Sequence, residues 1–229
     1  MATIQAKTIG QPTIRFQRLM WITMIVLCVI GGAVAIRRMV ALAFLPHNTP
    51  VQFAGLDEAF AEKRWLTLIH ITPALLLVTL VPFQFSRKFR SRHLRLHRWM
   101  GRTVVVLGLI IGISAVPMVR HPVGGMLEVS CILFFDALFL FSLTKAYLLI
   151  RRGQVAQHRE WMIRAMSVAL GVATVRPIMG MFFATSRLTG MTPHDFFGIA
   201  FWIGFTLTWI VGEVWIRYTR RVLSASIVI

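Results

Sequence analysis

The sequence predicts an all-α membrane protein that crosses the bilayer six times, and three observations support this fold class. Hydrophobic residues make up 57% of the 229 residues and the mean hydropathy is +0.72, which is well above the range of soluble domains. Six apolar stretches are long enough to span a bilayer, which requires about 20 such residues. The basic residues, which give a net charge of +17, cluster between these stretches, so we expect no nucleic-acid partner.

The six predicted transmembrane segments follow one another closely, so we expect a single membrane domain over residues 1–229. The first segment resembles a signal peptide with a cleavage site at residues 33–35, but Arg37 and Arg38 directly after that site argue against removal. Segments two to five are expected to form a central up-down four-helix bundle. In chain order the segments are residues 19–40, 65–85, 99–119, 126–150, 161–184 and 196–216.

The distribution of charge predicts the orientation, because positive charge is retained on the cytoplasmic side of a membrane. With six helices and an inner N-terminus, 18 of the 25 Lys and Arg residues lie on the inner side. Five of the eight acidic residues lie on the outer side, most of them near the long outer loop at residues 46–64. We therefore expect both termini in the cytoplasm and arginine clusters that bind anionic lipids at the cytoplasmic face.

Two similar motifs open segments three and five on the inner side. The first is HRWMGR, from His97 to Arg102, and the second is HREWMIR, from His158 to Arg164. Their tryptophans and arginines are typical interfacial anchors, but Lys or Arg would anchor better than histidine, so His97 and His158 are candidate ligands. His93 stands one turn further out between arginines, and we expect it to lie in the headgroup region outside any site.

Each of the two histidines begins a stripe of small residues along one helical face. Such a stripe most often lets two helices pack closely, whereas a narrow apolar slot beside a histidine would admit a flat cofactor or a lipid tail. The sequence leaves both interpretations open. The two stripes are His97, Gly101, Val104, Gly108, Gly112 and Ala115, and His158, Met162, Ala165, Ala169, Ala173 and Arg176.

Ionisable residues also fall inside the predicted segments, where an unpaired charge is costly and marks a functional candidate. His70 lies about 8 Å below the outer edge and Arg176 about 22 Å above the inner edge of a core about 30 Å thick. Asp136 lies near mid-membrane, so His70, Asp136 and Arg176 are predicted to form a polar layer in the outer half. The alternative interpretation is a structural ion pair between Asp136 and Arg176 that joins two helices. Glu213, near the inner end of segment six, is expected to pair with an inner arginine.

The combined motifs resemble the predicted bacterial membrane proteins grouped as domain of unknown function 2306. The resemblance covers about residues 65–180 and implies a shared multi-helix core in a bacterial inner (cytoplasmic) membrane. It singles out the histidines and arginines of the motifs, but implies no activity. The motifs are His70 with Pro73-Ala74-Leu75, then Pro82-Phe83-Gln84-Phe85, HRWMGR, HREWMIR and Val175-Arg176.

The first functional hypothesis is a protein that binds a haem b or a quinone-like redox ligand between helices. Two histidines from two helices of an antiparallel bundle are an established way to hold haem, and His97 and His158 start at matched depth. Arg102 and Arg164 would supply positive charge at the rim of this site. His70 and Arg176 are named as further cofactor-binding candidates.

Two alternatives belong to other classes. One is a non-enzymatic lipid-binding or partner-binding subunit, which would contact another membrane protein. The other is a metal-handling or respiratory assembly factor that uses His93, His97 and His158; because carboxylates and cysteines are missing nearby, we expect no metal site. GxSxG, GxxxxGK[ST], GxGxxG and HExxH motifs are absent, so the sequence does not indicate catalysis on a soluble substrate.

Overall fold

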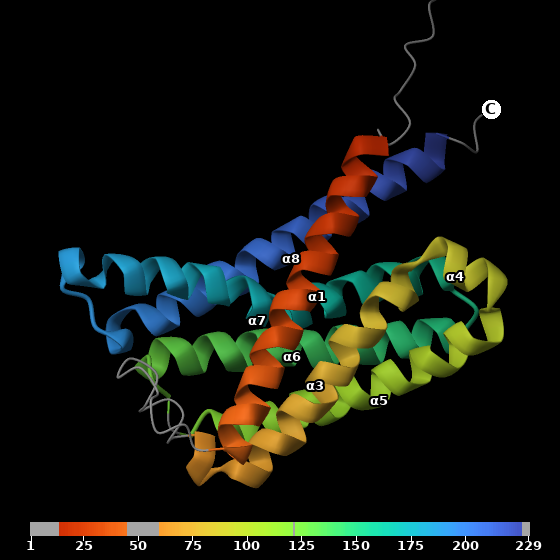
Figure 1. Ribbon diagram of the computed structural model, residues 1–229. Helices are drawn as coiled ribbons and strands as arrows, with labels where there is room; N and C mark the ends of the chain where they lie inside the picture. The colour runs from red at the N-terminus through yellow and green to blue at the C-terminus, as the bar shows by residue number, and fades with distance from the viewer. Residues whose placement is uncertain (1–13, 45–59, 121, 226–229) are drawn as a thin grey trace, which may run out of the picture.

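The computed structural model describes residues 14–44, 60–120 and 122–225, and this part of the chain is helical with short connections (Figure 1). The predicted all-α class is thereby confirmed. Most of the predicted outer loop at residues 46–64 lies outside the described residues. The helices are α1 (Ile14–Ala43), α3 (Arg64–Phe85), α4 (Arg87–Arg92), α5 (Leu94–Met118), α6 (Gly125–Arg151), α7 (Val155–Thr189) and α8 (Pro193–Ala225).

Six of these helices are long and apolar enough to cross a membrane, one for each predicted segment. Most extend past the apolar stretch that predicts them, because polar residues continue the helix beyond it. The short helix α4 was not predicted; Ser86 caps it by accepting a hydrogen bond from the backbone N–H of Phe89 at 3.2 Å. We call the end where α5 and α7 begin the His97 end, and the end where α3 begins the His70 end.

Helices that follow one another in the chain from α3 to α8 pack side by side, apart from the short α4, and α1 packs against two of them. Helix α5 packs against α3 and α6, and α7 packs against α6 and α8. Helix α1 crosses the front of the molecule in Figure 1 and contacts both α3 and α7. The predicted up-down order of segments two to five is therefore present, and α1 joins its first and last helices.

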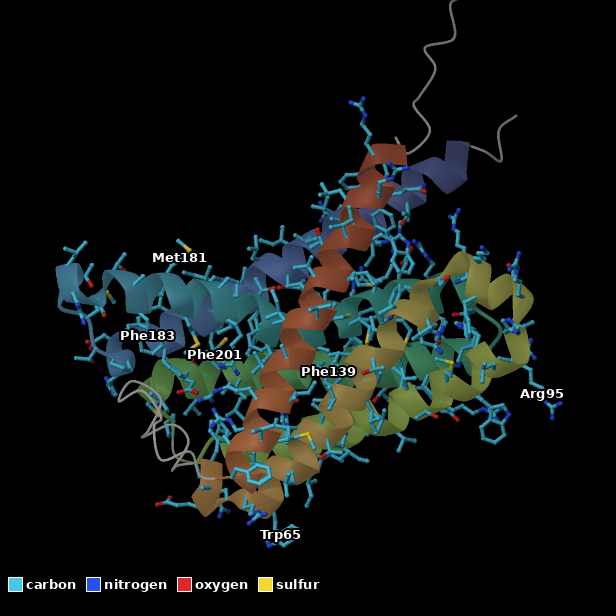
Figure 2. All side chains as sticks on the ribbon, in the orientation of Figure 1. Trp65, Arg95, Phe139, Met181, Phe183 and Phe201 are labelled. Carbon is cyan, nitrogen blue, oxygen red and sulfur yellow. The ribbon has the colours of Figure 1, made fainter. Side chains whose placement is uncertain are left out.

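Large apolar side chains cover the outside of the helices, as lipid exposure requires. Trp65 is 77% exposed, Met181 70% and Ile113 67%, and Trp65 and Met181 point away from the ribbon in Figure 2. In water such a surface would be a large apolar patch, whereas in a bilayer every spanning helix satisfies its own backbone and can present apolar side chains to the lipid. The interior is closed by buried aromatic and aliphatic side chains, among them Phe139, Phe196 and Leu143.

The turn between α7 and α8 is encoded locally. Gly190 ends α7 with a positive φ of 70°, a conformation in which glycine is favoured. Pro193 opens α8, a position that suits proline because no N–H is needed there. The Asp195 carboxylate accepts hydrogen bonds from the backbone N–H and the hydroxyl of Thr192, at 2.8 Å and 2.7 Å. These contacts hold the two longest helices in a tight hairpin.

Helices α6 and α8 meet at the His70 end with almost no side chain between them. A Cβ added to Gly124 would lie 2.6 Å from the backbone N of Gly198, and one on Gly198 would lie 2.9 Å from the backbone N of Glu128. The buried Glu128 carboxylate accepts a 2.7 Å hydrogen bond from the Gly124 N–H. Trp202 donates from its indole N–H to the Leu127 carbonyl at 3.1 Å.

Candidate functional site

His97 lies in the first turn of α5, because this helix begins at Leu94 and not at Trp99, where the predicted segment begins. The ring of His97 is half-buried and its Nδ1 is fully buried without a hydrogen-bond partner. Gln84, near the end of α3, donates from its side-chain amide to the His97 carbonyl at 3.2 Å. His93 is exposed beside Phe89, with 5.6 Å between ring centroids. The two histidines therefore occupy different surroundings, since His97 is half-buried and His93 is exposed.

His158 lies in the first turn of α7 and is joined to α6. Its Nδ1 is 2.8 Å from the carbonyl oxygen of Ala146. A carbonyl only accepts, so Nδ1 carries the proton and Nε2 of the neutral ring is left as an acceptor. This is the arrangement in which a protein fixes a histidine that coordinates or accepts through its other nitrogen. His158 and His97 lie within electrostatic range of each other, so the structure brings both to the same end.

Arg102 and Arg164, which were expected to supply positive charge at the rim of the His97–His158 site, contact other residues in the structure. Arg102 is exposed near the Trp99 ring, 5.4 Å from its centroid. It helps to line an open hollow of about 470 Å³ on the outward face of α5, together with Leu94, Arg95, Arg98 and Trp99. Arg164 makes a bidentate ion pair with Glu213 of α8, with nitrogen–oxygen distances of 2.5 Å and 3.1 Å. The expected pairing of Glu213 with an arginine is thereby confirmed.

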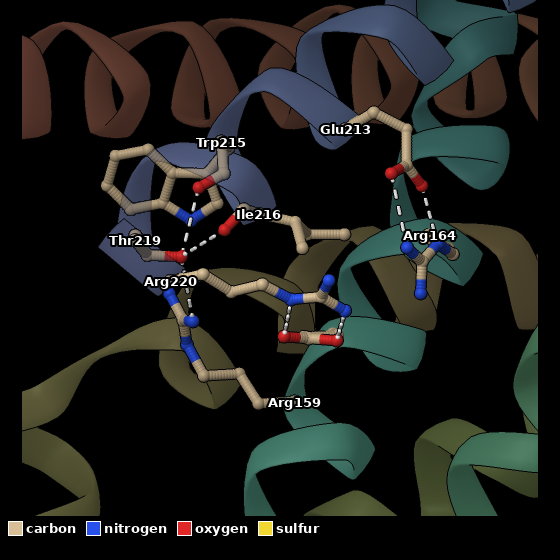
Figure 3. Close-up of polar contacts among 8 residues, drawn as sticks. Arg159, Arg164, Glu213, Trp215, Ile216, Thr219 and Arg220 are labelled. Atoms are coloured by element: carbon tan, nitrogen blue, oxygen red, sulfur yellow. Dashed lines mark hydrogen bonds and ion pairs between the residues drawn. The ribbon is translucent and has the colours of Figure 1, made fainter. Parts of the chain in front are cut away.

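The Arg164–Glu213 pair belongs to a polar strip between α7 and α8, shown in Figure 3. Arg220 makes a second bidentate pair with Glu160, and Arg159 donates to the Thr219 hydroxyl at 3.1 Å. Arg164 also lies over the Trp161 ring, 4.5 Å from its centroid. Sequence reasoning missed the Glu160–Arg220 pair, because the partners are 60 residues apart and only the closed hairpin brings them together.

At the His70 end the predicted polar layer divides into separate contacts. Nδ1 of His70 lies 3.0 Å from the Ser114 hydroxyl oxygen, and that hydroxyl lies 2.6 Å from the Ile110 carbonyl. The single Ser114 proton goes to the carbonyl, so the Nδ1–H of His70 donates to Ser114. This bond joins α3 to α5. Sequence reasoning did not find Ser114, because it resembles the small residues around it.

The Asp136–Arg176 ion pair does not form between these two described residues. Asp136 faces α5, with its Oδ1 3.1 Å from the position that a Cβ on Gly112 would take. Arg176 is on a different side, within electrostatic range of Arg37 and Arg38 of α1. Matched depth placed the two charges at one level, but their helices direct them to different neighbours.

The glycine stripe of α5 is a packing surface over most of its length. A Cβ on Gly108 would lie 2.6 Å from Leu143 Cδ2, and one on Gly112 would lie 2.5 Å from Leu140 Cδ2. There is no room here for a slot, so the close-packing interpretation is correct at these two positions. Gly101 is different, since a Cβ there would meet only the Gln84 amide oxygen at 3.6 Å. Along this stripe, space beside α5 is therefore found at Gly101 and not at Gly108 or Gly112.

The histidine set of the metal-handling alternative is not assembled. Among the described residues no group of three His, Cys, Asp or Glu side chains is arranged to hold a metal ion. His93, the residue that precedes α5, is exposed.

The helical fold, the apolar exterior and the paired charges define a polytopic all-α membrane protein. The chain belongs to the family described as a predicted membrane protein (DUF2306), which matches residues 67–216. The resemblance carried by the motifs is confirmed, and it extends beyond them to include most of α8, which those motifs did not cover. The comparisons with curated proteins and with solved structures returned no match.

Proposed function

We propose that this protein is a membrane-embedded binding protein for a quinone-type redox ligand at the His97 end. One observation carries the proposal: the bond from His158 to the Ala146 carbonyl fixes a tautomer whose Nε2 is left to accept from a ligand. The buried, unpartnered Nδ1 of His97 on the neighbouring first turn supports it. Buried ring nitrogens normally have partners, so the unpartnered Nδ1 of His97 beside an accepting Nε2 on His158 supports a ligand at this end.

The tautomer specifies the form of the ligand. A quinol presents hydroxyl donors, whereas an oxidised quinone presents only carbonyl acceptors. Nε2 of His158 accepts, so the reduced form binds more tightly. The difference is expected to be about tenfold for one hydrogen bond of about 1.4 kcal/mol. The head group would lie near the starts of α5 and α7, beside the space at Gly101, and its tail would run along the apolar exterior.

Haem is the second ligand of the same class, since two imidazoles from two helices also form an established axial pair. It requires a planar macrocycle between α5 and α7, where Gly108 and Gly112 are closed by α6 side chains. This packing favours the smaller quinone head group.

The test is ligand retention by the purified full-length protein and by three histidine variants. Extracted quinones are quantified, and oxidised and dithionite-reduced optical spectra are recorded. Quinol should be retained by the wild type and by His93→Ala, and be lost or weakened about tenfold in His97→Ala and His158→Ala. A Soret band that depends on the same two histidines would replace the quinone by haem. Absence of both ligands, including after addition of a short-chain ubiquinol, would contradict the proposal.

A second candidate function rests on the hollow of α5. Arg95, Arg98 and Arg102 line it beside Trp99, and this combination suits an anionic lipid headgroup at the membrane interface. In that case the protein is a lipid-binding or partner-binding subunit. Neutralising Arg95 and Arg98 together should then reduce retention of phosphatidylglycerol and leave quinol retention unchanged.

The distribution of basic residues along the whole sequence supports a proposed location in the cell. Because the sequence assigns 18 of the 25 Lys and Arg residues to the inner side of the predicted segments, where segments three and five begin, we place the His97 end in the cytoplasm and the protein in a bacterial inner membrane. Both termini are then cytoplasmic.

A further inference from the structure

Gln84 is a side chain of α3 that reaches the first two turns of α5. Its amide nitrogen Nε2 donates to the His97 carbonyl at 3.2 Å. A carbonyl oxygen only accepts, so this bond fixes which end of the amide is the nitrogen and which is the oxygen. The oxygen, Oε1, lies 3.6 Å from the position that a Cβ on Gly101 would take. The structure therefore directs an acceptor oxygen towards α5 at Gly101.

Gly101 belongs to the glycine stripe of α5, but its surroundings differ from those of the glycines further along. At Gly108 and Gly112 the stripe is filled by leucine side chains of α6, whereas at Gly101 an added Cβ would meet the Gln84 oxygen at ordinary van der Waals distance. His97 precedes Gly101 by four residues and so shares this face of the helix. The Gln84 oxygen thus faces the part of α5 that carries the His97 ring.

We propose that Gln84 is a ligand-binding residue of the His97 end, and that its Oε1 accepts a hydrogen bond from the second hydroxyl of a bound quinol. This inference rests on the proposed function, in which Nε2 of His158 accepts from the first hydroxyl. The two hydroxyls of a quinol project from opposite sides of its ring, so acceptors on two different helices can bind both. Gln84 belongs to α3, which packs against α5, and His158 belongs to α7, which packs against α6.

The second acceptor makes the site sensitive to the number of hydroxyl groups on the ligand. A quinol donates two hydrogen bonds, its monomethyl ether donates one, and the oxidised quinone offers only carbonyl acceptors. A quinone carbonyl beside the Gln84 oxygen would place two acceptors together without a hydrogen between them. The preference for the reduced form therefore depends on Gln84 as well as on His158.

The test measures equilibrium binding to the purified full-length protein by calorimetry, in detergent and without oxygen. The probes are duroquinol, a symmetric tetramethylated hydroquinone, and its single monomethyl ether. The ether should bind the wild type about tenfold more weakly than duroquinol does, the loss expected for one hydrogen bond. Gln84→Leu should bind duroquinol about tenfold more weakly than the wild type does. In this variant the ether and duroquinol should bind equally, because the acceptor for the second hydroxyl is gone.

Further variants separate ligand binding from a structural role of Gln84. Gln84→Glu loses the donor to the His97 carbonyl but keeps an acceptor oxygen, so it should bind duroquinol more tightly than Gln84→Leu. A purely structural role predicts equal losses in these two variants. Thr79→Val removes an exposed hydroxyl of the same helix that bonds to the Leu75 carbonyl at 2.8 Å, and it should leave binding unchanged. If Gln84→Leu does not fold, Gln84→Met takes its place, since a thioether is only a weak acceptor.

The outcomes distinguish this inference from the proposed function. If duroquinol does not bind to the wild type, both are overturned. If duroquinol binds and His158→Ala weakens binding while Gln84→Leu does not, the role of Gln84 alone is overturned. An equal loss for the ether in the wild type and in Gln84→Leu also overturns it, because the methyl group would then act through its size and not through the missing donor.

Discussion

The imidazole of His158 is joined to the backbone of Ala146 through a 2.8 Å contact between Nδ1 and the carbonyl oxygen. Helix α7 thus presents a histidine whose orientation is set by α6. His70 has the corresponding bond to Ser114 at the opposite end. In both rings the Nδ1 position is used within the protein and Nε2 is directed elsewhere.

This arrangement predicts the tautomers of both rings. In protein with ¹⁵N-labelled histidine, NMR at a pH where the rings are neutral should show His158 and His70 protonated at Nδ1. Free histidine prefers the other tautomer, so exposed His93 serves as an internal reference, and His158→Gln and His70→Gln assign the signals. An Nε2-protonated His158 would remove the basis for quinol preference.

The Arg164–Glu213 pair should show strong coupling in a double-mutant cycle. Both side chains are largely buried, at 14% and 24% exposure, so each single variant, Arg164→Gln or Glu213→Gln, leaves one buried charge unpaired. We expect a coupling free energy of about 1–3 kcal/mol in unfolding experiments. The more exposed pair of Arg220 with Glu160 is the comparison, and its coupling should be about 0–1 kcal/mol. Equal coupling in the two cycles would contradict this ranking.

Asp136 and Arg176 should behave independently, because they face different helices. The unfolding free energies of Asp136→Asn and Arg176→Gln should add in the double variant to within about 0.5 kcal/mol. A double variant more stable than either single variant would show instead that the two charges pair.

Substitution of glycine should be most harmful where two backbones meet. A Cβ at Gly124 would lie 2.6 Å from the backbone of Gly198, and backbone cannot move aside as a side chain can. We expect Gly124→Ala to lower the unfolding free energy by about 1–3 kcal/mol. Gly180, where a Cβ would meet nothing within 4 Å, is the control, and its alanine variant should be neutral or slightly stabilising. Similar losses at both positions would argue against the close crossing of α6 and α8.

Reporter fusions test the proposed orientation. A fusion after Ile229 should be active only with a cytoplasmic reporter, and an insertion at residue 50 only with a periplasmic one, because the sequence assigns 18 of the 25 basic residues to the inner side of the predicted segments. The opposite pattern at either position would reverse the assignment.

The number of spanning helices could be predicted because length and hydropathy alone decide whether a segment can cross a bilayer. The starts of α5 and α7 could not, since polar first turns lie outside the apolar stretch. This is why His97 lies within the first helical turn of α5 in the structure, whereas the sequence placed it just before the predicted transmembrane segment. Depth could be counted from the rise per residue, but the direction of a side chain depends on which helix packs against it. For this reason the residue count assigns Asp136 and Arg176 similar depths, although the two side chains face different helices.

The strip between α7 and α8 also has a consequence for how the protein enters the membrane. Arg164 is synthesised before Glu213, so it has no carboxylate partner on α8 until α8 has been made. The tight Gly190–Asp195 turn lets α8 fold back at once, and each acidic residue then neutralises an arginine of the other helix. We therefore expect a chain that ends before Glu213 to leave Arg164 without its carboxylate partner, and its α7 to be less stable than in the full-length protein.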